Sequence, residues 1–211
     1  MEIVLTPHTA KHKNYKLLGS FAPTFYRILD ERAAEWQDSK RDVPLLTMSG
    51  ELIERVTGEF KRQLDIEGSG RLRDGRVVNL DQKIDGGWRY VIVNNAPFGL
   101  GVDGYKLVPY RTLAVDLKVI RPGTVLYLPA LDGVRLPDGE RHDGFVFAHD
   151  EGQSITGNRI DVFVGFESDV DNILTRSRRI PDMEPTEVYL VDETMAAQLN
   201  RRFAQQFTYG K

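Results

Sequence analysis

Apolar residues recur at helical spacing in the first third of the chain. The two runs are Phe25, Leu29, Ala33 and Trp36, followed by Leu52, Val56, Phe60 and Leu64. Residues three to four positions apart share one face of a helix, so each run predicts an amphipathic helix. Pro23 and Ser49 stand at positions that suit the start of a helix. We therefore expect residues 1–63 to form a helical cover that packs on the rest of the protein.

From about residue 64 the pattern changes to short apolar runs punctuated by glycine and proline. Runs of this kind occupy residues 71–80, 88–93, 125–128, 145–148, 162–164 and 188–191. Many short strands with such turns are typical of a closed barrel, because closure leaves no strand edge exposed. We expect a β-barrel domain over residues 64–191.

A final helix is expected over residues 192–211. Its apolar side chains follow one another at intervals of four residues, and acidic residues occupy its first turn. These apolar positions are Met195, Leu199, Phe203 and Phe207. The predicted fold class is mainly β with flanking helices (α+β), with the N-terminal helical segment and the C-terminal helix packed on the barrel.

Composition narrows the class of protein. The chain has 211 residues, of which 41% are hydrophobic and 28% charged, as expected for a globular protein with one sizeable core. A formal net charge of −3 argues against general nucleic-acid binding. The absence of cysteine excludes disulfides, thiolate nucleophiles and cysteine-based zinc sites. No apolar run approaches the roughly 18 residues that a membrane-spanning helix needs.

Three aspartates carry the strongest chemical signal. Asp116, Asp150 and Asp161 each follow or interrupt a short apolar run. A carboxylate is costly in a buried strand, and a single one is most simply explained by a turn in which it accepts backbone N–H bonds. Three of them, separated by glycine-rich connections, predict a shared cleft. Burial and neighbouring like charges would raise a carboxyl pKa there.

The segments around these aspartates resemble a known domain. Residues 109–123 are similar to the pattern P-x-x-x-x-A-V-D-x-x-x-I-x-x-G, and residues 150–165 to D-x-G-x-x-I-x-G-x-x-x-D-x-F-x-G. Residues 66–80 are similar to Q-G-S-G-x-x-x-x-x-D-G. Together these patterns resemble the three-aspartate (3D) domain of the membrane-bound lytic transglycosylase A family. The resemblance covers about half of the chain and implies a six-stranded double-psi β-barrel.

The resemblance also implies a function. Lytic transglycosylases cleave the β-1,4 bond between N-acetylmuramic acid and N-acetylglucosamine in peptidoglycan. They use the sugar's own 6-hydroxyl instead of water, which leaves a 1,6-anhydro end. A single carboxylic acid that keeps its proton near neutral pH can serve as acid and then as base. The expected partner is therefore a peptidoglycan glycan strand, with no cofactor and no metal.

Family roles carry over to individual positions. Asp161 would be the general acid and base, Asp150 would hold or tune it, and Asp116 would mainly fix the barrel geometry. Further candidates for substrate binding are Ser69, Gly152, Gly157 and Asn158. The two glycines would let the backbone approach the sugar. For the serine and the asparagine, a structural role in a turn is equally open.

The chain departs from the family pattern at several points. Gln153 stands where a second glycine is usual, and Thr156 where many members have lysine. Large members insert a second domain that forms the other wall of the groove, whereas only residues 71–107 are available here. Helices of the N-terminal segment or a partner subunit would have to supply that wall, or the protein would lack it. The resemblance implies export to the cell envelope, but the first residues lack the pattern of a leader peptide, so the compartment and the oligomeric state stay open.

Two other classes of protein stay open. A non-catalytic module that binds peptidoglycan or another polysaccharide would keep the barrel without the acid. Trp88, Tyr90 and Tyr110 would then stack on sugars, although a barrel core is the commoner place for such aromatics. Alternatively the aspartates would bind a hard cation, but their spacing matches no calcium loop.

The histidines predict no catalytic role. His149 precedes Asp150, and adjacent residues of a strand face opposite sides, so we expect it to point away from the aspartates. His8, His12 and His142 show no metal-ligand spacing. The chain also has no nucleophile-elbow motif of a serine hydrolase.

Overall fold

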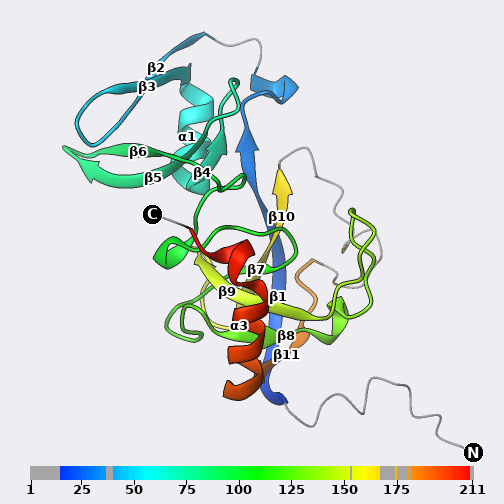
Figure 1. Cartoon of the computed structure of the whole chain (residues 1–211). Coiled ribbons are helices and arrows are strands. Elements are labelled where there is room, and N and C mark those ends of the chain that lie inside the picture. The colour runs from blue at the N-terminus through cyan, green and yellow to red at the C-terminus, as the bar shows by residue number, and fades with distance from the viewer. Residues whose placement is uncertain are drawn as a thin grey trace, which may run out of the picture.

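A computed structural model describes residues 15–36, 40–152, 154–166, 174, 180 and 182–209 (Figure 1). The strands are β1 (Tyr15–Asp30), β2 (Arg41–Leu46), β3 (Leu52–Thr57), β4 (Ser69–Arg71), β5 (Val77–Ile84), β6 (Gly87–Val93), β7 (Thr112–Val115), β8 (Val125–Tyr127), β9 (Phe145–Glu151), β10 (Arg159–Phe166) and β11 (Thr186–Val191). The longer helices are α1 (Gly58–Glu67) and α3 (Glu193–Phe207). Short 3-10 turns are η2 (Ala34–Trp36), η3 (Val102–Gly104) and η4 (Pro129–Leu131).

Six strands close into a barrel. They are hydrogen-bonded in the order β1, β10, β7, β9, β8, β11, and β11 pairs with β1 again. The pairs β1–β10 and β7–β9 are parallel, whereas the other four are antiparallel. Aliphatic side chains such as Leu113, Val146 and Ile160 fill the core without any solvent exposure. The predicted six-stranded barrel and mainly β fold class are confirmed.

The C-terminal helix packs on the outside of the barrel, as predicted. Asp192 caps it by accepting a 2.9 Å hydrogen bond from the Met195 amide, which satisfies one of the free N–H groups of the first turn. Phe203 and Phe207 pack against Phe147 of β9 with ring centroids 5.4 Å and 4.6 Å apart. None of the described helices combines the length and the apolar character needed to cross a bilayer.

The predicted N-terminal helix is wrong over the described residues. Tyr15–Asp30 forms β1, a 16-residue strand that pairs with β10 on one side and β11 on the other. Phe25 and Leu29 misled the prediction because residues four apart lie on one face of a strand as well as of a helix. The spacing of these two residues therefore could not separate the two structures. Tertiary pairing on both sides of the segment decides for the strand.

The second predicted helix is correct only in its later half. Leu52 and Val56 belong to β3, and α1 begins nine residues after the expected cap, Ser49. Thr57 is the actual N-cap, and its hydroxyl accepts a 3.0 Å bond from the backbone amide of Phe60. Ser49 lies in the turn between β2 and β3. The expected division at residue 63 is likewise wrong, because β1 belongs to the barrel.

A second unit stands at the end of β1 (Figure 1). It consists of the β2–β3 hairpin, α1 and the antiparallel strands β4, β5 and β6, which surround their own core of Phe60, Leu64, Val78 and Tyr90. The last two residues of β1, Leu29 and Asp30, pair in parallel with β4. One continuous strand therefore belongs to both units.

Buried ion pairs hold the second unit at the end of β1. Glu31 has no solvent exposure and accepts hydrogen bonds from the Arg41 guanidinium at 2.9 Å and the Arg73 amide at 3.0 Å. Asp30 pairs with Arg71, whose guanidinium also lies 3.4 Å from the ring centroid of Phe166 in β10. Since buried charges require partners, these contacts restrict how the two units sit together.

Glu31→Ala should destabilise the protein by about 1–3 kcal/mol, because it leaves a partly buried guanidinium and a backbone amide without their acceptor. Denaturant unfolding measures the change. Glu35→Ala, a nearby exposed acid, should change the free energy of unfolding by less than about 0.5 kcal/mol. Equal effects of the two variants would contradict a structural role for the ion pairs.

Candidate active site

A groove lies between the barrel and the second unit, with a cavity volume of about 1100 Å³. Strands β1, β7, β9 and β10 form its barrel side. The end of α1 and the strands β4 and β5 form the opposite side. The second wall that the resemblance requires is therefore built by this chain itself, partly from the segment predicted to be a helical cover.

Strand register brings two of the predicted aspartates into one row. Asp161 of β10 pairs with Ala114 of β7, and Ala114 pairs in turn with Asp150 of β9. Adjacent strands are about 4.8 Å apart, so the two aspartates flank a single alanine at a backbone separation of about 10 Å. Thr24 of β1 extends the row on the other side of Asp161.

A β-bulge is responsible for this alignment. Leu113 pairs with Ala148, but the next residue, Ala114, pairs with Asp150. The extra residue in β9 is His149. A regular ladder would have placed His149 beside Ala114, since one residue of register exchanges the two faces of a strand.

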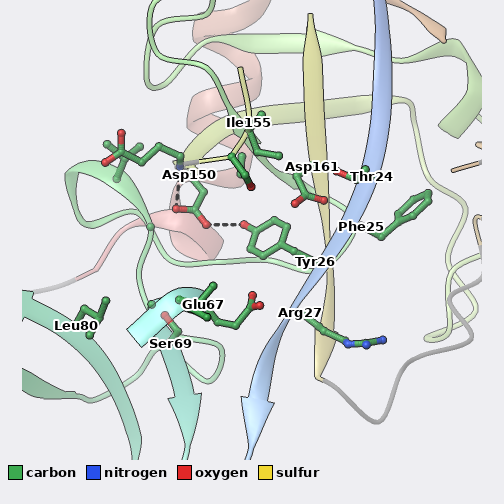
Figure 2. A pocket seen from close by; sticks show the side chains of 18 of the residues that line it. Thr24, Phe25, Tyr26, Arg27, Glu67, Ser69, Leu80, Asp150, Ile155 and Asp161 are labelled. Carbon is green, nitrogen blue, oxygen red and sulfur yellow. Dashed lines mark hydrogen bonds between the residues drawn. The ribbon is translucent and has the colours of Figure 1, made fainter. Parts of the chain in front are cut away.

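Asp150 is held by two donors. The Tyr26 hydroxyl donates to its Oδ2 at 2.6 Å, and the Glu151 amide donates to its Oδ1 at 2.9 Å (Figure 2). Burial raises the pKa of Asp150 to about 6, although these hydrogen bonds to the ionised form oppose the rise. The carboxylates of Glu151 and Asp161 add to it.

Asp161 has a similar pKa but fewer partners. Its Oδ1 is buried and has no hydrogen-bond partner among the described residues. Burial raises the pKa of Asp161 to about 6, the neighbouring Thr24 hydroxyl and Arg159 oppose the rise, and the carboxylates of Glu67 and Asp182 add to it. A carboxyl group in this environment retains its proton to higher pH than an exposed one, as a general acid must.

Asp116 does not reach the groove, so the prediction that all three aspartates share one cleft is wrong. Its two oxygens accept the backbone amides of Lys118 at 2.9 Å and Gly157 at 2.8 Å. These hydrogen bonds lower the pKa of Asp116, the bond from Gly157 contributing most. The side chain ties the connection between β9 and β10 to the end of β7.

The predicted substrate-binding residues divide into two pairs. Ser69 and Gly152 line the groove. A Cβ on Gly152 would lie 2.6 Å from the Ile155 side chain, so this glycine is required for close packing. Gly157 and Asn158 lie outside the groove lining, and the Asn158 amide donates to the Ser20 carbonyl at 3.5 Å.

The two departures from the family pattern fall in the connection between β9 and β10. Gln153 lies outside the described residues, and Thr156 is exposed without lining the groove. Thr156 therefore does not contribute to the described lining of the groove.

Tyr26, Glu67 and Ala114 are among the groove residues that the sequence prediction did not include. Tyr26 lies in a segment that was predicted to be a helix. Glu67 is the last residue of α1, and no sequence motif marks it. The alanine belongs to the Ala-Val-Asp motif, in which the prediction assigned a role only to Asp116. Alternation along β1 places Thr24 and Tyr26 on the same face, which would have been visible once the segment was assigned as a strand.

The aromatic residues considered for sugar stacking are mostly inaccessible. Tyr90 and Tyr110 are 1% and 6% exposed, which contradicts their proposed use as open stacking platforms. His149 faces away from the groove, as expected, and stacks on the Tyr105 ring at a centroid distance of 3.8 Å. Burial lowers its pKa to about 4.

The fold and the groove define a protein with a closed six-stranded barrel and, in the groove beside it, two aspartates whose pKa values are raised. Residues 111–179 match the family model of the 3D domain, so the chain contains this domain, as its motifs predicted. The matched segment contains all three aspartates of the predicted motif.

Comparison with solved structures gives the same fold. Escherichia coli MltA with bound chitohexaose is 15% identical with a TM-score of 0.52, and the match covers 82% of this chain and 72% of MltA. MltA from Neisseria gonorrhoeae is 11% identical with a TM-score of 0.50 over the same shares of the two chains. At these identities the likeness is one of fold. The curated proteins gave no match.

Asp161→Asn should stabilise the protein above pH 6. The folded-state pKa of Asp161, about 6, exceeds the ordinary value of 3.8. Ionisation of this group above pH 6 therefore destabilises the folded protein, and the stability returns as the pH falls toward 4 and Asp161 becomes protonated. We expect a gain of about 1–3 kcal/mol at pH 7.5 and little change near pH 4, measured by denaturant unfolding. The exposed Asp138→Asn should show no such pH-dependent difference.

Tyr26→Phe should raise the pKa of Asp150 above 6, because the lost hydroxyl donates to the ionised carboxylate. Carboxyl carbon NMR shifts recorded against pH measure this pKa. Tyr90→Phe removes a hydroxyl that donates to Asp65 instead and serves as the control. An unchanged titration of Asp150 in Tyr26→Phe would exclude the hydrogen bond.

Proposed function

We propose that this protein is a peptidoglycan lytic transglycosylase with Asp161 as its acid and base. The bond cleaved is the β-1,4 linkage between N-acetylmuramic acid and N-acetylglucosamine. The observation that carries the proposal is the row of Asp161, Ala114 and Asp150 along the floor of a groove. It supplies a carboxyl group with raised pKa beside a narrow space that no large side chain occupies.

The reaction requires two successive proton transfers at one carboxyl group. Protonated Asp161 donates to the glycosidic oxygen as the bond from that oxygen to C1 of the muramic acid breaks. The resulting carboxylate then accepts the proton of the 6-hydroxyl as O6 bonds to the same C1. The 1,6-anhydro product forms without water, and Asp161 regains its proton.

The partners of the two aspartates favour Asp161 over Asp150 for this role. Both oxygens of Asp150 accept hydrogen bonds, which favour the ionised form. Asp161 has a buried oxygen without such a donor. Asp150, oriented by Tyr26, is left to contact the sugar or to stabilise developing positive charge at C1. Ala114 provides the room between them, and Ser69 contributes a hydroxyl from the second wall.

Comparison supports the substrate class. Escherichia coli MltA, which shares the fold, has been solved with chitohexaose, an oligosaccharide with the same β-1,4 linkage between amino sugars. A groove with a cavity volume of about 1100 Å³ has room for part of a glycan strand. The proposal implies that the protein acts in the cell envelope, where peptidoglycan lies.

Digestion of purified sacculi, followed by mass analysis of the muropeptides, tests the proposal. The wild type should release 1,6-anhydro products, and Asp161→Asn should release them at least about 10²-fold more slowly, because general acid–base catalysis is lost. Asp138→Asn on an exposed turn should retain the wild-type rate.

Other outcomes have defined meanings. Products with a reducing end would overturn the transglycosylase mechanism in favour of hydrolysis. Sedimentation of wild type with sacculi in the absence of any product would favour the non-catalytic binding module. Full activity of Asp161→Asn would refute its assignment as the acid.

A further inference from the structure

Glu67 occupies a position that its local structure does not explain. It is the last residue of α1, before Gly68 ends the helix in the left-handed conformation at φ 81°. A carboxylate is disfavoured at a helix C-terminus, where the backbone carbonyls carry partial negative charge. Glu67 makes no hydrogen bond or ion pair with any residue that the structure describes. No contact of its own compensates this placement.

The side chain faces the aspartates across the groove. Glu67 lies on the second wall, whereas Asp161 and Tyr26 lie on the barrel side (Figure 2). Among charged groups, Glu67 makes the largest contribution to the raised pKa of Asp161. Its charge also raises the pKa of Tyr26, the donor to Asp150. Burial in turn raises the pKa of Glu67 itself.

The other charged groups around Asp161 oppose one another. Arg159 on its own strand lowers the pKa of Asp161, and Asp182 raises it. Arg27 of β1 lowers the pKa of Glu67. On β9, Asp150 is coupled to Asp161 and is adjacent to Glu151. Glu67 is therefore the charge on the second wall that acts on Asp161.

We propose that Glu67 is a positioning residue of the second wall, which favours the protonated form of Asp161 through repulsion between their carboxylates across the groove. The inference rests on the proposed function and deepens it. The barrel carries the acid, and the second unit controls whether the acid holds its proton. Any movement that widened the groove would weaken the repulsion and release the proton more easily.

Glu67→Gln tests the proposal because it removes the charge and keeps the shape. Loss of the repulsion should lower the pKa of Asp161 by roughly half to one unit, and the alkaline limb of the kcat/KM profile should shift to lower pH by the same amount. On that limb the rate should fall roughly three- to tenfold, whereas the rate at acidic pH should stay near that of the wild type. Glu67→Asp keeps the negative charge, so the pKa of Asp161 in this variant should stay close to that of the wild type.

Two controls separate charge from structure. Glu59→Gln removes the same charge from the first turn of α1, where Glu59 pairs with Arg62 on the exposed surface, and should leave the profile unchanged. A loss of activity that is equal at all pH values in Glu67→Gln would indicate a structural role and overturn the proposal.

Carboxyl carbon NMR of Asp161 separates this inference from the proposed function. The shift in the pKa of Asp161 on Glu67→Gln is measured without any substrate. An unchanged pKa overturns the coupling even if sacculi are cleaved. A lowered pKa in a protein that yields no anhydro products supports the coupling and refutes the transglycosylase function instead.

Discussion

The hydrogen bonding of β1 is the constraint on which the rest of the structure depends. This strand closes the barrel by pairing with β10 and β11, then continues into the second unit through its pairing with β4. The groove lies where the strand passes from one unit to the other, and residues 24–27 line it. Residues 15–21 pair with β11, residues 22–28 with β10 and residues 29–30 with β4, so hydrogen bonds hold almost the whole strand as a rigid base for such a site.

The site is built at a cost to stability. Two half-buried carboxylates in the groove are costly, because apolar side chains would pack there without desolvating a charge. The bulge in β9 turns Asp150 rather than His149 toward this row, and the buried Asp161 oxygen lacks a donor. Such features are tolerated where chemistry requires them, and the surrounding apolar core supplies the stability that they forgo.

The second unit provides what a barrel alone lacks. It has a core of its own around Phe60 and Tyr90, and the paired charges of Asp30, Glu31 and their arginines fix it to the end of β1. A wall held in this way excludes water from one side of the aspartates. Desolvation is the main cause of their raised pKa, so the placement of this unit and the acidity of the barrel residues are linked.

Local sequence patterns determined much of the architecture. Short apolar runs with glycine and proline turns predicted the barrel. The four-residue spacing before Phe207, together with the acidic first turn, predicted the outer helix. The aspartate motifs predicted the 3D domain and two of the three groove positions. Only the tertiary structure decided that residues 15–30 form a strand and that Asp116 turns away. It also decided that Tyr26 and Glu67 face Asp150 and Asp161. The physical reason is that hydrogen-bonded register between distant strands, including a one-residue bulge, sets which side chains meet, and no local pattern encodes that register.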